Sequence, residues 1–389
     1  MQLADRMRNL GTETAFDVLA KARALEAKGR KIIHLEIGEP DFDTPGNITE
    51  AAITALKQGY THYGPAAGLP ELREAVVKRM ERTRGLKVDP ARVVVTPGAK
   101  PIMYFTILAL VNAGDEVIYP DPGFPIYESM IGFIGAVKRP IRLREEREFR
   151  LDVNELADLV NEKTRLIILN SPHNPTGGVL TESDLAAIAD IVGDSKVMIL
   201  SDEIYSDILY DAEHHSIASL PGMLDRTILL DGFSKTYAMT GWRLGYGIFP
   251  DWLAPQIAKL QINATSCTAT FTQRAGVEAL NGPQDGAQAM KAEFRRRRDV
   301  IVKGLNEIPG VSCLTPQGAF YVFPNITKIG KTSQELADLL LNEAGVATLP
   351  GTAFGPAGQG YLRFSYANSV ENIQFALEKV GEVMGAIRA

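Results

Sequence analysis

The chain has 389 residues, of which 45% are hydrophobic, and this length allows a large core and two domains. Its net charge of −6 argues against a nucleic-acid partner, whose binding surface would be basic. The two cysteines, Cys267 and Cys313, lie far apart, which indicates neither a disulfide framework nor a zinc site. No unbroken run of apolar residues is long enough for a transmembrane helix, and residues 1–10 lack the apolar run of a signal peptide. We therefore expect a cytoplasmic protein with no membrane partner.

Short apolar runs alternate with helical patterns through the middle of the chain, after a helix expected at 17–28. Each strand candidate is too apolar to be half exposed, which indicates a sheet that is buried on both faces. This alternation predicts an α/β fold with a mostly parallel sheet. The strands are expected at 93–96, 116–119, 166–169, 197–200 and 227–230, and two of the helices at 101–111 and 181–192.

The last hundred residues have a different pattern. A charged helix is expected at 292–305, strands at 320–323 and 361–365, and a closing helix at 370–387. This order predicts a smaller α+β domain, made of residues 1–45 and 291–389, beside a large domain at 46–290. The four arginines at 295–298 would point all round a helix, which predicts a solvated helix rather than a binding patch.

Lys235 follows the last predicted strand of the sheet, and open α/β sheets place ligands at the carboxyl ends of their strands. An amine at this place can form a Schiff base, while Ser234 and Arg243 hold a phosphate. Pyridoxal phosphate (PLP) requires this combination. Taken alone, an exposed lysine in an ordinary loop is the commoner explanation, so the interpretation depends on partners elsewhere in the chain.

Asp202 follows another apolar strand, where its carboxylate can pair with the protonated ring nitrogen of PLP. A helix N-cap is the alternative role. Tyr205 could donate a hydrogen bond to the phenolate oxygen of the cofactor, as could Asn174 in the rigid loop 170–178. Plain packing and a simple turn are the alternatives for these two residues. His173 is expected to serve only the structure of the loop.

Three further motifs each allow two interpretations. Gly98 frees backbone N–H groups at a helix start, which predicts a modest phosphate site, and Lys100 beside it is either a phosphate neighbour or a contact to an acidic substrate. Phe124 could stack on a planar ring or pack inside a turn. Arg363 lies in an apolar run and needs an anionic partner, such as the α-carboxylate of an amino acid, unless the run is an exposed strand face.

Together these motifs resemble the class I/II aminotransferases, a family of fold-type I PLP enzymes, and most closely the bacterial aspartate aminotransferase-like branch. The resemblance runs from Gly38-Glu-Pro-Asp-Phe to Arg363. It implies that Lys235 forms the Schiff base and acts in catalysis with Asp202 and Tyr205. The implied PLP contacts are Tyr63, Gly98, Ala99, Lys100, Phe124, Asn174, Asp202, Tyr205, Ser234, Lys235 and Arg243, and the implied substrate contacts are Gly38, Lys100, Asn174 and Arg363.

The resemblance also implies a homodimer with shared active sites, because Tyr63 matches a family tyrosine that reaches the phosphate of the partner subunit. The implied reaction moves an amino group from L-aspartate or a similar amino acid to a 2-oxo acid, expected to be 2-oxoglutarate. Two departures leave broad or aromatic specificity open. Phe124 stands where aspartate-specific relatives often have tryptophan, and residues 263–272 lack the arginine that some of them use.

Three other functions are alternatives to transamination. A PLP-dependent C–S lyase, or another α- or β-eliminating enzyme, is the alternative within PLP chemistry and stays open. A regulatory module linked to DNA binding is disfavoured by the acidic charge. A nicotinamide-dependent enzyme is disfavoured because the glycine fingerprint of dinucleotide binding is missing.

Overall fold

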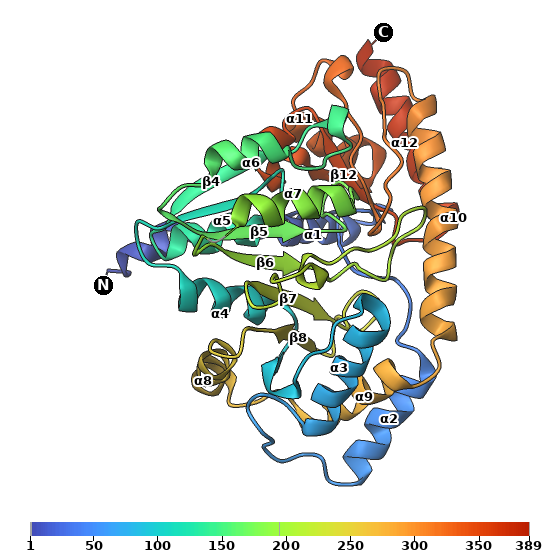
Figure 1. Cartoon of the computed structure of the whole chain (residues 1–389). Coiled ribbons are helices and arrows are strands. Elements are labelled where there is room, and N and C mark those ends of the chain that lie inside the picture. The colour runs from blue at the N-terminus through green and yellow to red at the C-terminus, as the bar shows by residue number, and fades with distance from the viewer. Residues whose placement is uncertain (1, 194, 389) are drawn as a thin grey trace.

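The computed structural model describes residues 2–193 and 195–388. Its centre is a seven-stranded sheet with the strand order β2-β8-β7-β6-β5-β3-β4 (Figure 1). Neighbouring strands from β7 to β4 are parallel, whereas β8 runs antiparallel to β7 and to β2. The predicted α/β fold with a mostly parallel sheet is therefore confirmed. The strands are β2 (Val93–Thr96), β3 (Glu116–Asp121), β4 (Val137–Arg142), β5 (Thr164–Asn170), β6 (Met198–Asp202), β7 (Thr227–Gly232) and β8 (Gly245–Ile248).

Helices cover both faces of this sheet. Side chains along a strand point alternately to its two faces, so Ile168 and Leu200 belong to one apolar cluster and Ile167 and Ile199 to another. The first face packs against α4 (Lys100–Leu110), α5 (Pro125–Phe133) and α8 (Ala254–Thr265). The second face packs against α6 (Val153–Leu159), α7 (Glu182–Val192) and α3 (Pro70–Arg84). α9 (Thr270–Asn281) packs on α3, and α2 (Gly46–Lys57) packs on α9.

All five strands predicted for this sheet are present, but β4 and β8 were missed. β4 lies at the edge of the sheet and is largely exposed, so it has no apolar run. β8 contains Gly245 and Gly247, which lower strand propensity. The helix start predicted at Thr181 is confirmed, because its hydroxyl accepts from the N–H of Asp184 in a capping box.

The rest of the chain forms two small sheets with helices around them. β11 (Leu349–Pro350), β12 (Leu362–Ser365) and β9 (Tyr321–Val322) form one sheet, and β1 (Ile33–His34) pairs with β10 (Val346–Ala347) in the other. The accompanying helices are α1 (Thr14–Glu26), α10 (Asp285–Glu307), α11 (Ser333–Leu339) and α12 (Val370–Arg388). α1 contacts β10 and β11, as expected for a helix that packs on this part.

The long helix α10 runs along one side of the molecule, from the region of α2 and α9 to α12 (Figure 1). α10 continues across the predicted domain boundary at residue 290. The division into a large domain (46–290) and a small domain (1–45 together with 291–389) stays a prediction. Within the described ranges, none of the helices combines the length and the apolar character that a membrane span requires.

The prediction of a solvated arginine cluster on α10 is wrong for two of its four members. Arg297 and Arg298 are buried. Arg297 lies 2.6 Å from a carboxylate oxygen of Asp41 and 2.9 Å from one of Glu293, and Arg298 lies 2.7 Å from Asp211. Four consecutive helical residues point in different directions, and two of these directions face the packed side of α10.

Candidate active site

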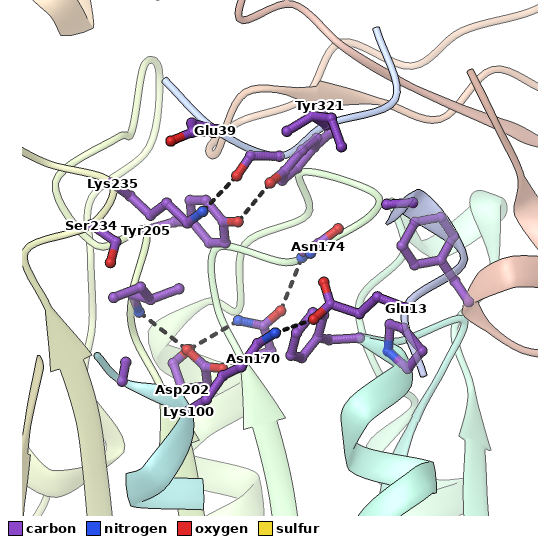
Figure 2. A pocket seen from close by; sticks show the side chains of 18 of the residues that line it. Glu13, Glu39, Lys100, Asn170, Asn174, Asp202, Tyr205, Ser234, Lys235 and Tyr321 are labelled. Carbon is purple, nitrogen blue, oxygen red and sulfur yellow. Dashed lines mark hydrogen bonds and ion pairs between the residues drawn. The ribbon is translucent and has the colours of Figure 1, made fainter. Parts of the chain in front are cut away.

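A cavity of about 330 Å³ lies at the carboxyl ends of β5, β6 and β7. Loops that follow parallel strands meet at this edge of a sheet, and they form what we call the strand-end wall, with Asn170, Asn174, Asp202, Tyr205, Ser234 and Lys235. Glu13, Gly38, Glu39, Tyr321, Phe354 and Arg363 also line the cavity, and we call this second group the cover. Figure 2 shows Glu13, Glu39 and Tyr321 of the cover beside the labelled residues of the wall. The predicted site residues that line the cavity are Gly38, Ala99, Lys100, Phe124, Asn174, Asp202, Tyr205, Ser234, Lys235, Arg243 and Arg363.

Lys235 follows the end of β7 by three residues, as predicted. Its Nζ donates a hydrogen bond to the backbone oxygen of Gly38 at 2.5 Å (Figure 2). The residue as a whole is partly exposed, but its amine is enclosed by protein, and this burial lowers the pKa of the amine to about 8. A fraction of the amine is therefore neutral at physiological pH, and the neutral form is the nucleophile.

Asp202 is the last residue of β6, and its carboxylate is held by two hydrogen bonds. Oδ2 accepts from the hydroxyl of Tyr127 at 2.6 Å, and Oδ1 accepts from the N–H of Ile204 at 3.2 Å. Burial raises the pKa of Asp202 to about 6, against the opposing effect of the Tyr127 hydrogen bond. The residues that follow form a turn rather than a helix, so the alternative role of an N-cap does not apply.

Asn174 and Arg363 meet across the cavity. The guanidinium of Arg363 donates to Oδ1 of Asn174 at 3.1 Å and also to the backbone oxygen of Glu36. It lies 4.4 Å from the ring centre of Tyr321 and 4.8 Å from that of Phe354. The amide oxygen of Asn174 thus accepts from Arg363, and its NH2 group is the part of the side chain that can donate a hydrogen bond to a ligand.

Arg363 is only 4% exposed, so the alternative of an exposed strand face is wrong. No carboxylate of the described residues forms an ion pair with it, and its Nε has no hydrogen-bond partner among them. Burial lowers the pKa of the guanidinium. A buried cation in this state binds an anion favourably, because the anion replaces the lost hydration.

The predicted phosphate site depends on two glycines. Gly98 has a φ of +86°, and a side chain there would collide with the guanidinium of Arg243. A Cβ at Gly245 would lie 2.5 Å from the backbone nitrogen of Ala99. The glycines thus let β8, Arg243 and the first turn of α4 approach one another, and Ala99, Ser234 and Arg243 line the same cavity. Backbone N–H groups at a helix start are suited to hold a phosphate.

Lys100 and Phe124 lie together at one side of the cavity. The Nζ of Lys100 pairs with the carboxylate of Glu13 (Figure 2) and lies 5.5 Å from the ring centre of Phe124. Phe124 precedes α5 as its N-cap residue and is only partly buried. Lys100 is therefore held towards the cover by an acidic side chain, and both of its predicted roles remain open.

Tyr205 and Tyr63 have surroundings that the sequence did not predict, whereas those of His173 agree with its expected role in the loop. The hydroxyl of Tyr205 lies 2.7 Å from that of Tyr321. Tyr63 is 89% exposed and does not line the cavity. His173 is buried, with Nδ1 at 2.8 Å from the hydroxyl of Thr176, and burial lowers the pKa of its ring to about 3, which fits a role within the loop.

Four residues of the site were not assigned from the sequence. Asn170 links the wall, because its Oδ1 accepts from the N–H of Asn174 and its Nδ2 donates to the backbone oxygen of Asp202 at 3.1 Å. Asn170 lies in the loop 170–178 and Tyr127 lies three residues after Phe124, so a polar residue in or near a recognised motif was the available signal. Glu13 and Tyr321 come from distant segments, and nothing in their local sequence marks them.

The residues of the cavity fit PLP. An enclosed amine and a buried carboxylate lie in the same wall, and the absence of a side chain at Gly98 lets the guanidinium of Arg243 lie against the helix start at the cavity. Backbone N–H groups, a hydroxyl and a guanidinium are the donor set that a phosphate prefers.

Comparison with known proteins agrees with this geometry. The family of class I and II aminotransferases matches residues 30–380. The aspartate aminotransferase of Pyrococcus abyssi is 44% identical over 363 residues, which cover 92% of this chain and 93% of that protein. Aromatic-amino-acid aminotransferase 2 of Thermococcus litoralis is 41% identical over 388 residues, covering 99% and 98%. The structure of Thermus thermophilus aspartate aminotransferase with maleate matches with a TM-score of 0.94 at 37% identity, covering 98% and 100%.

The chain therefore belongs to the class I and II aminotransferase family. It is a PLP-dependent aminotransferase of fold type I, as the motifs around Lys235 predicted.

Proposed function

We propose that Lys235, Asp202 and Arg363 are the three groups that carry out transamination in this enzyme. The observation that supports this assignment is their convergence on one cavity from three different segments. When bound, PLP supplies an electron sink that stabilises negative charge on the α-carbon of the substrate. Asp202 holds a proton on the ring nitrogen by its charge, and the Nζ of Lys235 takes up and returns the proton of the α-carbon.

Arg363 orients the substrate in this proposal. Its planar fork can bind both oxygens of an α-carboxylate, and its buried charge is then neutralised. Asn174 already contacts the guanidinium, so it fixes the plane in which the carboxylate binds. The α-carbon would thereby be directed towards Lys235 of the strand-end wall.

The remaining predicted contacts concern the cofactor. The N–H groups near Gly98 and Ala99, with Ser234 and Arg243, would hold the phosphate, and Phe124 would stack on the ring. Tyr205 can donate its proton to the phenolate oxygen while its lone pairs accept from Tyr321, so the hydrogen bond at 2.7 Å is compatible with this role.

We propose L-aspartate or a similar acidic amino acid as the donor and 2-oxoglutarate as the acceptor. Lys100 is the cation that could bind the side-chain carboxylate of the substrate, which would then displace Glu13. The second candidate is an aromatic amino acid. It is supported by the apolar lining of Phe124, Leu349 and Phe354, and by the aromatic-amino-acid aminotransferase of Thermococcus litoralis among the relatives.

A half-reaction screen tests the proposed function. Purified holoenzyme is mixed with each L-amino acid in turn, without an oxo acid, and the loss of the visible absorbance of the lysine-bound cofactor is followed. We expect aspartate and glutamate to react fastest. Faster reaction of phenylalanine or tyrosine would select the aromatic alternative, and no change with any amino acid would contradict transamination. Release of pyruvate and ammonia from a cysteine conjugate, without an acceptor, would indicate the C–S lyase.

We also propose a homodimer with shared sites, supported by the exposure of Tyr63 outside its own cavity. A mixture of Lys235→Ala and Tyr63→Ala subunits tests this directly. If the sites are shared, hybrid dimers contain one intact site and regain activity that neither variant has alone. No recovery after subunit exchange would contradict sharing. The domain division and the cytoplasmic location stay predictions, which limited proteolysis and cell fractionation would test.

A further inference from the structure

A group of buried charges lies behind the strand-end wall, on the face of the sheet that packs against α3. Asp202 points into the cavity, and the next residue, Glu203, points to the other face. Asp231, near the end of β7, points to the same face as Glu203. Arg84, the last residue of α3, contacts both of these carboxylates, and the side chains of all three are no more than 2% exposed.

Both carboxylate oxygens of Glu203 have hydrogen-bonding partners. Its Oε2 accepts from Nε of Arg84 at 2.7 Å and lies 2.7 Å from Nε2 of His214. Its Oε1 accepts from the hydroxyls of Ser201 at 2.9 Å and Ser216 at 2.6 Å. Despite burial, Arg84 and His214 lower the pKa of Glu203 to about 2, so the carboxylate is charged.

Asp231 is fixed by the same arginine. Its Oδ2 accepts from Arg84 and from the hydroxyl of Tyr246, each at 3.0 Å, and its Oδ1 accepts from the N–H of Gly232 at 2.7 Å. Arg84 also donates to the hydroxyl of Ser206 at 3.0 Å, in the turn after β6. One guanidinium therefore joins the end of β6, the turn that follows it and the end of β7.

Stability alone does not explain such a cluster. Removing charges from water costs several kcal/mol per ion, and apolar residues of similar volume often stabilise a fold as well or better. The two carboxylates that Arg84 contacts also lie close in the chain to the proposed catalytic residues. Glu203 adjoins Asp202 in the chain, and Asp231 precedes Lys235 by four residues.

We propose that Arg84 is a positioning residue, which fixes Asp202 and Lys235 relative to each other by holding Glu203 and Asp231 in one fork. The inference rests on the proposed roles of Asp202 and Lys235. Arg84 does not reach the cavity, so it acts only through the strand ends that it connects.

The electrostatic surroundings support this role. The negative charges of Asp231 and Glu203 contribute to the raised pKa of Asp202, after the larger effect of burial. Arg84 compensates both charges, and Arg79 lies 4.0 Å from Asp231. Without Arg84, the negative charges of Glu203 and Asp231 would be only partly compensated. They would then favour protonation of Asp202 and of other titratable groups of the site on the opposite face of the sheet.

The test compares Arg84→Met and Arg84→Lys with Arg92→Met in the holoenzyme. Arg92 is a matched control, because it is also buried but lies at the amino edge of the same sheet, where it donates to the backbone oxygens of Phe249 and Leu224. Thermal stability, kcat, KM and the pH midpoint of the visible absorbance are measured for each variant. All three variants are expected to be less stable than the wild type.

For Arg84→Met we expect kcat to fall by about 10- to 100-fold, as for a small misplacement of reacting groups, with KM within about threefold. The midpoint of the absorbance should move upward by about one pH unit, because a compensating cation is lost. Arg84→Lys keeps the charge but not the fork, so the midpoint should stay near that of the wild type while kcat still falls by about three- to tenfold. Arg92→Met should leave kcat and the midpoint unchanged.

A kcat and a midpoint for Arg84→Met that equal those of Arg92→Met would overturn the proposal. If Arg84→Met does not fold, Arg84→Lys decides, because an unchanged kcat in that variant has the same meaning. These results are distinguishable from a failure of the proposed function, which would appear as substantial turnover in Lys235→Ala.

Discussion

The strand-end wall and the cover of the cavity are built in different ways. In the wall, Asp202 and Lys235 lie within three residues of strand ends, and the sheet itself sets their directions. In the cover, Glu13, Gly38 and Arg363 come from separate segments of the chain. Gly38 and Arg363 meet the wall through hydrogen bonds with Lys235 and Asn174, and Glu13 forms an ion pair with Lys100. Under the proposed function, the wall would set the chemistry, whereas the cover would recognise the substrate.

The largest effect is expected in the wall, at Lys235. Lys235→Ala should lower kcat by at least about 10⁴-fold, because the other lysine that lines the cavity, Lys100, is paired with Glu13 and does not replace the enclosed amine. Single-turnover absorbance measurements with saturating amino acid would report this loss. A variant that keeps most of its activity would show that the wall does not set the chemistry.

The next largest effect is expected for Asp202→Asn, which preserves shape and removes charge. Without the carboxylate, the ring nitrogen is no longer held protonated, and kcat should fall by about 10²- to 10⁴-fold. Tyr127→Phe is the matched control, because it removes only the hydrogen bond to Asp202 and should reduce kcat by less than about tenfold. Equal kinetics for the two variants would contradict the role of the charge.

The cover should respond differently, and Arg363→Lys tests this contrast. Lysine keeps the charge but loses the planar fork, so kcat/KM should fall by about 10²-fold for every amino acid, mainly through KM. The visible absorbance of the holoenzyme should be unchanged, because the wall is intact. A changed absorbance together with an unchanged KM would reverse the assignment of wall and cover.

A pH experiment on the cofactor-free protein sharpens the description of the wall. Burial lowers the pKa of Lys235 to about 8, so the neutral, nucleophilic fraction of the amine rises with pH, reaches one half near pH 8 and approaches completion above it. The rate of cofactor capture should therefore rise about tenfold per pH unit below 8 and then level off. Stopped-flow absorbance would follow this rate, and a rise that continues to pH 10 would show an ordinary, exposed lysine.

The smallest effect is expected in the cover, at Glu13. Glu13→Gln frees Lys100 from its ion pair, so kcat/KM for acidic amino acids should rise about two- to fivefold, while that for phenylalanine stays the same. Lys100→Gln should have the opposite effect on acidic substrates. Parallel changes for acidic and aromatic substrates in both variants would exclude this pair from substrate choice.

The same contrast explains what the sequence could predict. Asp202, Asn174 and Lys235 were recognisable because each follows an apolar strand, and parallel strands end at one edge of a sheet. Arg363 was recognisable because an arginine is unusual in an apolar run. Local patterns of this kind predict both the fold and most residues of the strand-end wall.

The remaining contacts depend on residues that are distant in the chain. Glu13 is an ordinary acidic residue before a helix, and only the packing of α1 brings it to Lys100. The hydrogen bond between Tyr205 and Tyr321 and the cluster around Arg84 also join separate segments. Such contacts follow from the three-dimensional arrangement, so a single sequence could not reveal them.

Reductive trapping followed by peptide mapping tests the central claim most directly. The holoenzyme is treated with borohydride, digested and analysed by mass spectrometry for a lysine that carries the reduced cofactor. We predict that the peptide containing Lys235 carries the adduct in stoichiometric amount. An adduct on another lysine, such as Lys100, or none at all, would contradict the account.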